Sequence, residues 1–267
     1  MRDDMAGHVA AYEHTVRSTI ALAEAFEAAD WERPTECPGW SVRDQISHIV
    51  GVERLVLGDP LPEHTLPGDL PHVRNDMGRF NEIAVDIRRS VPGPKVLDEL
   101  RDTLNRRLAE LPDVDPDRPT RLPNGRMDTY TRFMAFRAFD CWTHEQDIRR
   151  AVGRPGNLAS PGAERAHEIL TGSLPYVVGK LAAAAPGQSV TLEITGPLRG
   201  TSHVVVGDDG RAVRTDAIAA PTVTLRMDWE TYARLACGRV PAASAAVTIG
   251  GDPDLARRVL AALSVTP

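Results

Sequence analysis

Apolar residues recur at helical spacing along most of the first 155 residues of the chain. Separate stretches with this pattern cover residues 5–29, 42–57, 75–89, 95–111 and 128–152. Loops rich in proline and glycine separate these stretches. Because each long stretch has one apolar face to bury, the pattern predicts a bundle of about four long helices in this half.

The pattern changes in the second half of the chain, where short segments typical of strands replace the long helices. These segments cover residues 190–195, 203–206, 211–215, 223–227 and 246–249. Shorter helical stretches follow at 229–236 and from the Asp252-Pro253 pair to residue 263. We therefore predict a helical domain over residues 1–157 and an α+β domain with a small antiparallel sheet over 158–267.

One face of the helix predicted at 128–152 carries ionisable side chains where apolar ones are expected. At about 100° per residue, this face contains Arg137, Asp140, His144 and Asp147. Burying unpaired charges costs several kcal/mol, so these groups need charged partners or a metal ion. Asp140 and His144 are four residues apart, a spacing at which two side chains of one helix can bind the same ion.

A third possible ligand, His48, lies at the edge of the apolar face of the helix predicted at 42–57. Together with Asp140 and His144 it would provide three ligands and leave one position open, as in catalytic zinc sites. The alternative is an ordinary Asp–His pair on one helix, with His48 a half-buried histidine whose hydrogen bonds are satisfied. Glu53 lies near the centre of the same apolar face and needs a partner, for which Arg137 is suited.

Composition and charge narrow the class of protein. The 267 residues are 42% hydrophobic and 25% charged, with a net charge of −6 and no long basic run, which argues against a nucleic-acid partner. No apolar run is long enough to span a membrane, and the acidic N-terminus lacks a signal-peptide pattern. The three cysteines, Cys37, Cys141 and Cys237, are far apart. We therefore expect free thiols in a cytoplasmic protein, either a monomer or a homodimer.

Two motifs resemble the mycothiol-dependent maleylpyruvate isomerase family. They are TECPGWSVRD at residues 35–44, followed by His48, and the series Arg137-x-x-Asp140-x-Trp142-x-His144-x-x-Asp147. The resemblance extends over almost the whole chain, including residues 223–239 and the turn at 250–253. It implies a DinB-like four-helix bundle that binds a divalent metal, usually zinc, followed by a domain similar to sterol-carrier proteins. The family's ligands correspond to His48, Asp140 and His144, although characterised isomerases have glutamate in place of Asp140.

The resemblance also implies a reaction. Mycothiol would bind the metal as a thiolate and attack an electrophilic carbon, giving either cis–trans isomerisation of a maleylpyruvate-like substrate or S-transfer to an electrophile. We assign Arg137 and Arg239 to catalysis, because a cation should stabilise the enolate-like intermediate. Asp147 and Glu53 would support the bound metal and cofactor from behind the ligands.

Each of these roles has a structural, non-catalytic alternative. Arg137 could equally form an ion pair with Glu53 or Asp147, and Arg239 could be an ordinary surface residue. The rival function is a non-catalytic protein that binds a metal and a small ligand with the same fold. A coordination sphere closed by four protein groups favours this rival, whereas an open position beside a pocket favours the enzyme.

Overall fold

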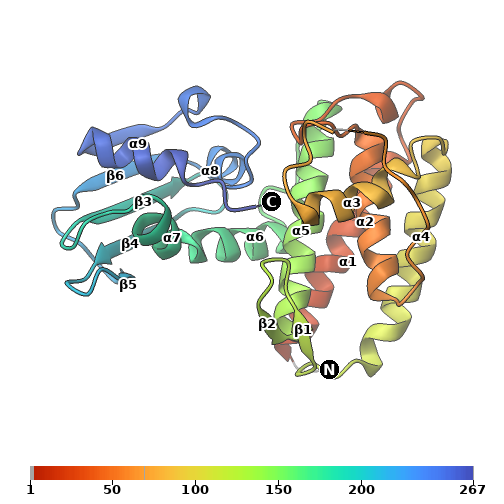
Figure 1. Ribbon diagram of the computed structural model, residues 1–267, viewed down its shortest axis with the longest axis horizontal. Coiled ribbons are helices and arrows are strands. Elements are labelled where there is room, and N and C mark those ends of the chain that lie inside the picture. The colour runs from red at the N-terminus through yellow and green to blue at the C-terminus, as the bar shows by residue number, and fades with distance from the viewer. Residues whose placement is uncertain (1–2, 69, 267) are drawn as a thin grey trace. The chain divides into compact units, whose positions relative to one another are not determined.

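The protein, seen in a computed structural model, is described over residues 3–68 and 70–266 (Figure 1). It consists of two compact units that divide between Arg165 and Ala166, within helix α6 (Pro161–Gly172). The boundary predicted after residue 157 lies in the loop before this helix and stays a prediction. No helix in the described ranges combines the length and the apolar character needed to cross a membrane.

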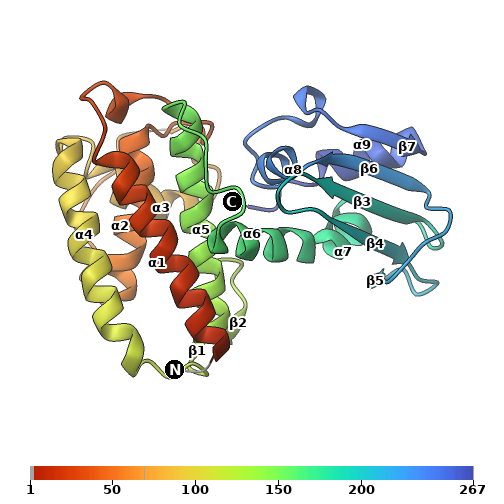
Figure 2. The ribbon, with the colours of Figure 1, turned by 180° about the vertical axis from the view of Figure 1, so that it is seen from behind.

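The first unit is the predicted four-helix bundle, formed by α1 (Asp3–Ala23), α2 (Val42–Val56), α4 (Gly93–Glu110) and α5 (Tyr130–Ala151). Figures 1 and 2 show these helices from opposite sides, with α1 beside α5 and α2 beside α4. The shorter α3 (Asp76–Asp86) packs against α2. Single helical turns lie at Asp30–Glu32 and Leu111–Asp113. A hairpin of β1 (Pro119–Arg121) and β2 (Met127–Thr129) precedes α5, where the sequence indicated only turns.

The start of α2 is fixed by reciprocal hydrogen bonds between the side chains and backbone N–H groups of Ser41 and Asp44. The Ser41 hydroxyl accepts a hydrogen bond from the Asp44 backbone N–H, and the Asp44 carboxylate accepts one from the Ser41 N–H. This capping box satisfies two backbone donors that the first helical turn cannot use. It sets the helical register, and the register determines the side on which His48 emerges.

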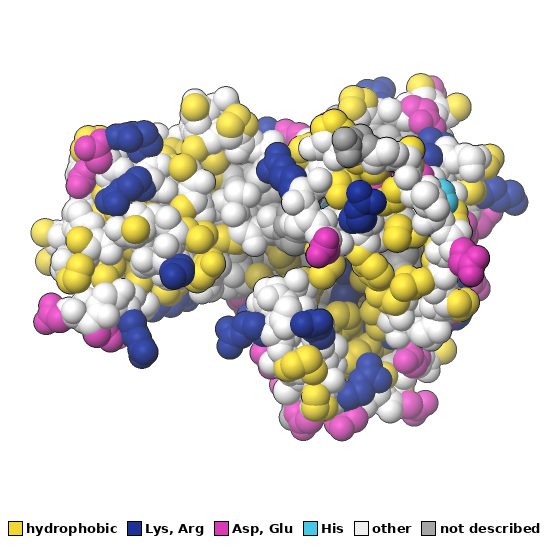
Figure 3. All heavy atoms as spheres, viewed as in Figure 1, with side chains coloured by type: hydrophobic (Ala, Val, Ile, Leu, Met, Phe, Trp, Pro, Cys, Tyr) yellow, Lys and Arg dark blue, Asp and Glu magenta, His cyan; other side chains and the backbone are white. Residues whose placement is uncertain are grey.

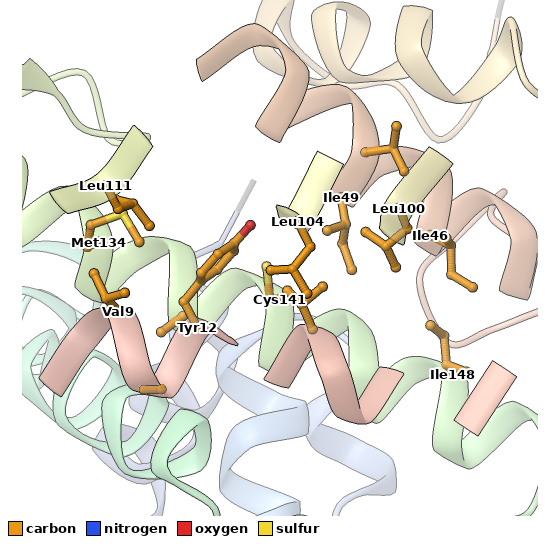
Figure 4. Close-up of a cluster of buried hydrophobic side chains, with 14 of the residues drawn as sticks. Val9, Tyr12, Ile46, Ile49, Leu100, Leu104, Leu111, Met134, Cys141 and Ile148 are labelled. Atoms are coloured by element: carbon orange, nitrogen blue, oxygen red, sulfur yellow. The ribbon is translucent and has the colours of Figure 1, made fainter. Parts of the chain in front are cut away.

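Apolar side chains from the four long helices meet in one core (Figure 4). Labelled members from each helix are Tyr12 of α1, Ile46 and Ile49 of α2, Leu100 and Leu104 of α4, and Cys141 and Ile148 of α5. All of these side chains are at most 1% exposed, which makes burial of apolar surface the main force holding the helices together.

A network of charged side chains crosses this apolar interior. Glu53 of α2 accepts hydrogen bonds from Arg137 of α5 (Nε to Oε1, 2.7 Å) and from Arg107 of α4 (Nε to Oε2, 2.9 Å). Arg107 also donates to the Tyr130 hydroxyl at 2.6 Å. Glu53 and Arg107 are fully buried and Arg137 is 3% exposed, so each charge depends on its partners. The ion pair between Glu53 and Arg137 that the sequence suggested is therefore present.

The second unit is built on a five-stranded sheet in the order β5-β4-β3-β6-β7. Its strands are β3 (Ser189–Thr195), β4 (Gly200–Val206), β5 (Ala212–Thr215), β6 (Val223–Asp228) and β7 (Thr248–Gly251). The helical segments of this half are α7 (Leu174–Tyr176), a π-helical turn at Val177–Leu181, α8 (Trp229–Ala236), a 3-10 turn at Ala242–Ser244 and α9 (Pro253–Ala261).

The prediction of an antiparallel sheet is wrong for one pair of strands. β3 and β6 run parallel, with Leu192 opposite Leu225, while the other three pairings are antiparallel. Between these two strands the chain first forms β4 and β5 on one side of β3, and β6 then enters on the other side. Alternating apolar residues are compatible with either direction, so the pattern could not distinguish a mixed sheet from an antiparallel one.

We predict that replacing Glu53 with glutamine destabilises the helical unit by about 3–5 kcal/mol, because two buried guanidinium groups lose their counter-charge. Urea unfolding followed by far-UV circular dichroism measures the change. The matched control is Glu13→Gln, which removes an exposed pair between Glu13 (36% exposed) and Arg17 (57% exposed). This control should shift stability by less than about 0.5 kcal/mol. Equal shifts in the two variants would contradict the structural role of the network.

Candidate metal centre

Two helices bring three possible metal ligands together. His48 comes from α2, and Asp140 and His144 come from successive turns of α5. One ligand atom from each residue can be chosen so that all three lie within 4.8 Å of one another. The Nε2 atom of His48 lies 3.3 Å from Asp140 Oδ2, and the Nε2 atom of His144 lies 3.5 Å from Asp140 Oδ1. The three residues that the sequence selected are thus neighbours in space.

The donor set suits a divalent cation. Two imidazoles and one carboxylate are ligands that zinc and similar metals accept, and in catalytic sites three protein ligands leave a position for water or substrate. In the part of the chain that the structure describes, this is the one group of His, Cys, Asp or Glu residues close enough to hold an ion. Both imidazoles are buried, whereas the Asp140 side chain is 31% exposed. The triad could therefore bind a metal and is open to ligands on the side of Asp140.

The protonation states of the free site also suit a cation. Burial lowers the pKa of His48, although the nearby Asp140 carboxylate opposes this, so the imidazole is neutral at pH 7. Burial alone would raise the pKa of Asp140, but the Arg137 guanidinium, together with the interactions that the two imidazoles make with the carboxylate, outweighs burial and holds that pKa well below its usual value. The site therefore offers a carboxylate and a neutral imidazole lone pair without first losing protons.

Gln45 orients one of the imidazoles. Its Oε1 atom lies 2.5 Å from His144 Nδ1, and its Nε2 donates to the Thr35 hydroxyl at 2.7 Å. Because an amide oxygen only accepts, His144 Nδ1 carries a proton, and Nε2 is the nitrogen that faces Asp140. Gln45 was not among the residues predicted from the sequence. The feature that could have identified Gln45 as a supporting residue is its position on the buried side of α2, three residues before His48.

Asp147, which the sequence analysis placed behind the ligands as a support for the metal and cofactor, makes no hydrogen bond to His144 Nδ1. Its Oδ2 lies 3.8 Å from His144 Nδ1, beyond hydrogen-bond distance, and its Oδ1 accepts from Arg150 at 2.6 Å. The hydrogen bond to this nitrogen is made by Gln45. A direct contact between Asp147 or Glu53 and a bound cofactor stays a prediction.

Trp40 forms a wall of the site. Its ring lies 5.1 Å from the His48 ring and 5.8 Å from the His144 ring, measured between centroids. The indole Nε1 donates to Glu82 of α3 at 2.8 Å, which fixes the ring in place. In the sequence, Trp40 stood out only as part of the motif at residues 35–44. Its contact with both imidazoles arises from the fold of the loop before α2 and could not be deduced from spacing.

Arg137 connects the triad to the buried charge network. Its Nη1 donates to Asp140 Oδ2 at 2.8 Å while its Nε donates to Glu53. Its remaining terminal nitrogen, Nη2, lies 3.6 Å from Cys141 Sγ. All of its nitrogens thus face protein groups, which supports the alternative of an ion pair with Glu53. A catalytic role for Arg137 stays a prediction, and the geometry makes it a residue that positions Asp140.

The remaining residues considered from the sequence lie elsewhere. Arg239 belongs to the second unit, where its Nη1 donates to the Cys237 carbonyl at 2.7 Å, and its catalytic role also stays a prediction. Cys141 is fully buried on the side of α5 that faces the core (Figure 4) and does not belong to the group of candidate ligands. Burial raises the pKa of its thiol well above the usual value, so this cysteine is a poor nucleophile.

Known proteins share both the sequence pattern and the fold. The chain matches the family model of the mycothiol maleylpyruvate isomerase N-terminal domain over residues 12–149, and that of the MDMPI C-terminal domain over residues 164–258. The crystal structure of the mycothiol-dependent maleylpyruvate isomerase superposes with a TM-score of 0.56 at 11% identity, covering 95% of this chain and 98% of that one. A mutant of that isomerase gives a TM-score of 0.55 with the same coverage.

Relatives also occur in Mycobacterium tuberculosis. The uncharacterized proteins Rv0036c and MT0041 are each 24% identical to this chain over 182 residues, covering 66% of this chain and 68% of their own length. The structural likeness, at 11% identity, demonstrates the fold alone, whereas the two family models together account for most of the sequence. The chain therefore belongs to the mycothiol maleylpyruvate isomerase family.

Proposed function

We propose that this protein is a divalent-metal-dependent enzyme that uses a low-molecular-weight thiol, mycothiol, to isomerise an electrophilic substrate or to form an S-conjugate with it. The observation that carries the proposal is the triad of His48, Asp140 and His144, which has three donors and one exposed edge. A fourth protein ligand would close the coordination sphere and favour a structural metal instead. Family membership supplies the thiol and the reaction class as hypotheses for this chain.

Zinc fits the donor set, since two imidazoles and a carboxylate with an open position are typical of catalytic zinc sites. A divalent cation held there would supply Lewis acidity, stabilising the thiol as its thiolate near neutral pH. Asp140 differs from the glutamate of the characterised isomerases by one methylene. Its hydrogen bond from Arg137 nevertheless fixes its carboxylate beside both imidazoles.

The surrounding residues prepare the site before any ligand enters. Gln45 holds His144 in the tautomer that leaves Nε2 free, and Arg137 holds Asp140 ionised and oriented. The Trp40 ring contacts both imidazoles on one side. Such fixed geometry lowers the cost of reorganisation when substrate binds.

The two possible reactions share their first step. The thiol sulfur forms a bond to one carbon of an activated C=C group, and the electron pair of the π bond moves onto the activating carbonyl. In isomerisation, rotation about the resulting single bond is followed by cleavage of the S–C bond, which regenerates the thiol. In S-conjugation, the proton lost by the thiol ends on the neighbouring carbon. We retain Arg239 as the proposed cation for the developing negative charge.

We expect the metal-loaded protein to catalyse one of these reactions with mycothiol and a panel of electrophiles that includes maleylpyruvate. Loss of ultraviolet absorbance measures isomerisation, and loss of free thiol measures conjugation. His48→Ala should lower both the bound metal and the rate, the latter by about 100-fold or more, because a ligand is lost. His14→Ala, which alters an exposed histidine of α1, is the matched control and should change neither quantity.

Two results would contradict this proposal. Protein purified without added ions that contains no divalent metal, together with no effect of His48→Ala on metal content, would remove its basis. Bound metal without turnover of any electrophile would instead indicate a binding protein with the same fold.

A second prediction concerns the orientation of His144. Gln45→Ala removes the acceptor for Nδ1–H and should weaken metal binding by about 10- to 100-fold, the usual effect of losing such a partner. Competition with a chromogenic chelator measures the affinity. Gln188→Ala, in which the lost side chain accepts a hydrogen bond from the Ala185 backbone in the second unit, is the control. Unchanged affinity in Gln45→Ala would show that Gln45 does not orient the ligand.

A further inference from the structure

A cavity of about 160 Å³ lies between α2, α3 and the loop that follows α2. His48 is one of its lining residues, so the cavity meets the candidate metal centre at this imidazole. None of the other ligands or supporting residues of the centre lines it. The cavity is therefore a compartment next to the triad and is separate from the residues assigned to the metal and its immediate support.

The wall of this cavity is mainly apolar. Its apolar side chains include Val52 and Leu55 of α2, Leu61 of the loop, Phe80 and Ile83 of α3, and Ile87 directly after α3. Two of these side chains are exposed to solvent, Leu55 by 38% and Leu61 by 56%. Figure 3 shows hydrophobic side chains gathered on the face of the helical unit seen in that view. A concave apolar wall of this kind is typical of a small-molecule site.

The arginines at the cavity are already paired with carboxylates. Arg54 donates to Asp59 at 2.9 Å, and Arg88 donates to Glu99 at 3.0 Å and to the Ala84 carbonyl at 2.8 Å. Hydrogen bonds from Arg106 and Arg54 lower the pKa of Asp59 to about 2, so this carboxylate keeps its charge throughout the physiological range. Each guanidinium thus has its counter-charge, and no unpaired cation remains among the lining residues to receive a second anion.

The size and polarity of the cavity restrict its ligand. An apolar cavity of roughly 150 Å³ is large enough to hold a benzene ring. A carboxylate placed against such a wall without a free cation would lose its hydration at a cost of several kcal/mol. An uncharged ring or branched alkyl group would instead gain about 25 cal/mol for each Å² of apolar surface that it buries.

We propose that this cavity binds the uncharged, apolar part of the electrophile and holds it beside His48. The substrate class is then a neutral electrophile that carries an aromatic or branched aliphatic group, rather than a small dicarboxylate. This inference rests on the proposed function, which it narrows towards S-transfer. The mainly apolar lining of the cavity and the pairing of both lining arginines with carboxylates agree with it.

The test measures binding directly, without thiol or turnover. Fluorobenzene serves as the neutral probe and maleate as the dicarboxylate, and both are titrated into metal-free and metal-loaded protein by NMR. We expect fluorobenzene to bind at least about tenfold more tightly than maleate to the metal-free protein, a difference of about 1.4 kcal/mol. In Co²⁺-loaded protein, the fluorine signal of the bound probe should show a paramagnetic shift, because the cavity adjoins His48.

Two substitutions locate the probe in the cavity. Ile83→Trp fills it and should weaken fluorobenzene binding by about tenfold or more, since the apolar contact surface is lost. Leu55→Glu places a charge on the exposed wall of the cavity and should also weaken fluorobenzene binding. This substitution is less likely to disturb folding, because Leu55 is partly exposed. Val213→Trp, at an exposed apolar position of β5, is the control and should leave binding unchanged.

The inference is overturned if maleate binds as tightly as fluorobenzene, if neither cavity variant weakens fluorobenzene binding, or if Co²⁺ that is shown to be bound at the triad causes no shift of the bound probe. Failure of the proposed function gives a different result. In that case the triad binds no metal or the loaded protein has no activity, while fluorobenzene still binds the metal-free protein and still responds to Ile83→Trp and Leu55→Glu.

Discussion

The buried ion pair between Glu53 and Arg137 is the interaction on which the candidate site depends. It joins α2, which carries His48, to α5, which carries Asp140 and His144. The same guanidinium that binds Glu53 also holds the Asp140 carboxylate. Both charges lie in an apolar core. A shift of the two helices that broke the pair would therefore leave each charge buried without its partner, which is strongly destabilising. The charge network thus fixes the distance between the helices that supply the ligands.

The candidate metal site is enclosed by protein on one side and accessible on the other. Gln45 and Trp40 hold the imidazoles from the α2 side, while the exposed edge of Asp140 gives access to a ligand. The apolar cavity at His48 adds a compartment of different chemistry next to this polar centre. The proposed thiol needs a cation and would bind at the metal centre, whereas the proposed apolar electrophile needs an apolar surface and would bind in the cavity. The two proposals therefore concern separate parts of the helical unit.

Sequence patterns predicted the features that depend on local spacing. Apolar periodicity identified the long helices, and the four-residue spacing of Asp140 and His144 placed both on one face of α5. The direction of β6 was not predictable, because parallel and antiparallel strands share the same alternation. The hairpin of β1 and β2 was also missed, since its strands are only three residues long.

Partners that come from another helix or loop were harder to identify than ligands on one helix. Glu53 and Arg137 were matched because each was a charge on an apolar face, and few alternatives existed. Gln45 is uncharged, so nothing marked it as the partner of His144, and Asp147 was chosen because it lies one turn away. In the fold, Asp147 binds Arg150 instead. Choosing between two polar neighbours of an imidazole requires the packing of α2 against α5, which spacing alone does not contain.

X-ray absorption spectroscopy of the zinc-loaded protein, before and after addition of mycothiol, determines whether the metal centre is open and binds the thiol. We predict two imidazole nitrogens and further oxygen ligands at about 2.0–2.2 Å, and then the appearance of one Zn–S distance of about 2.3 Å when the thiol is added. A spectrum with four protein ligands that does not change with thiol would contradict an open, thiol-binding metal centre.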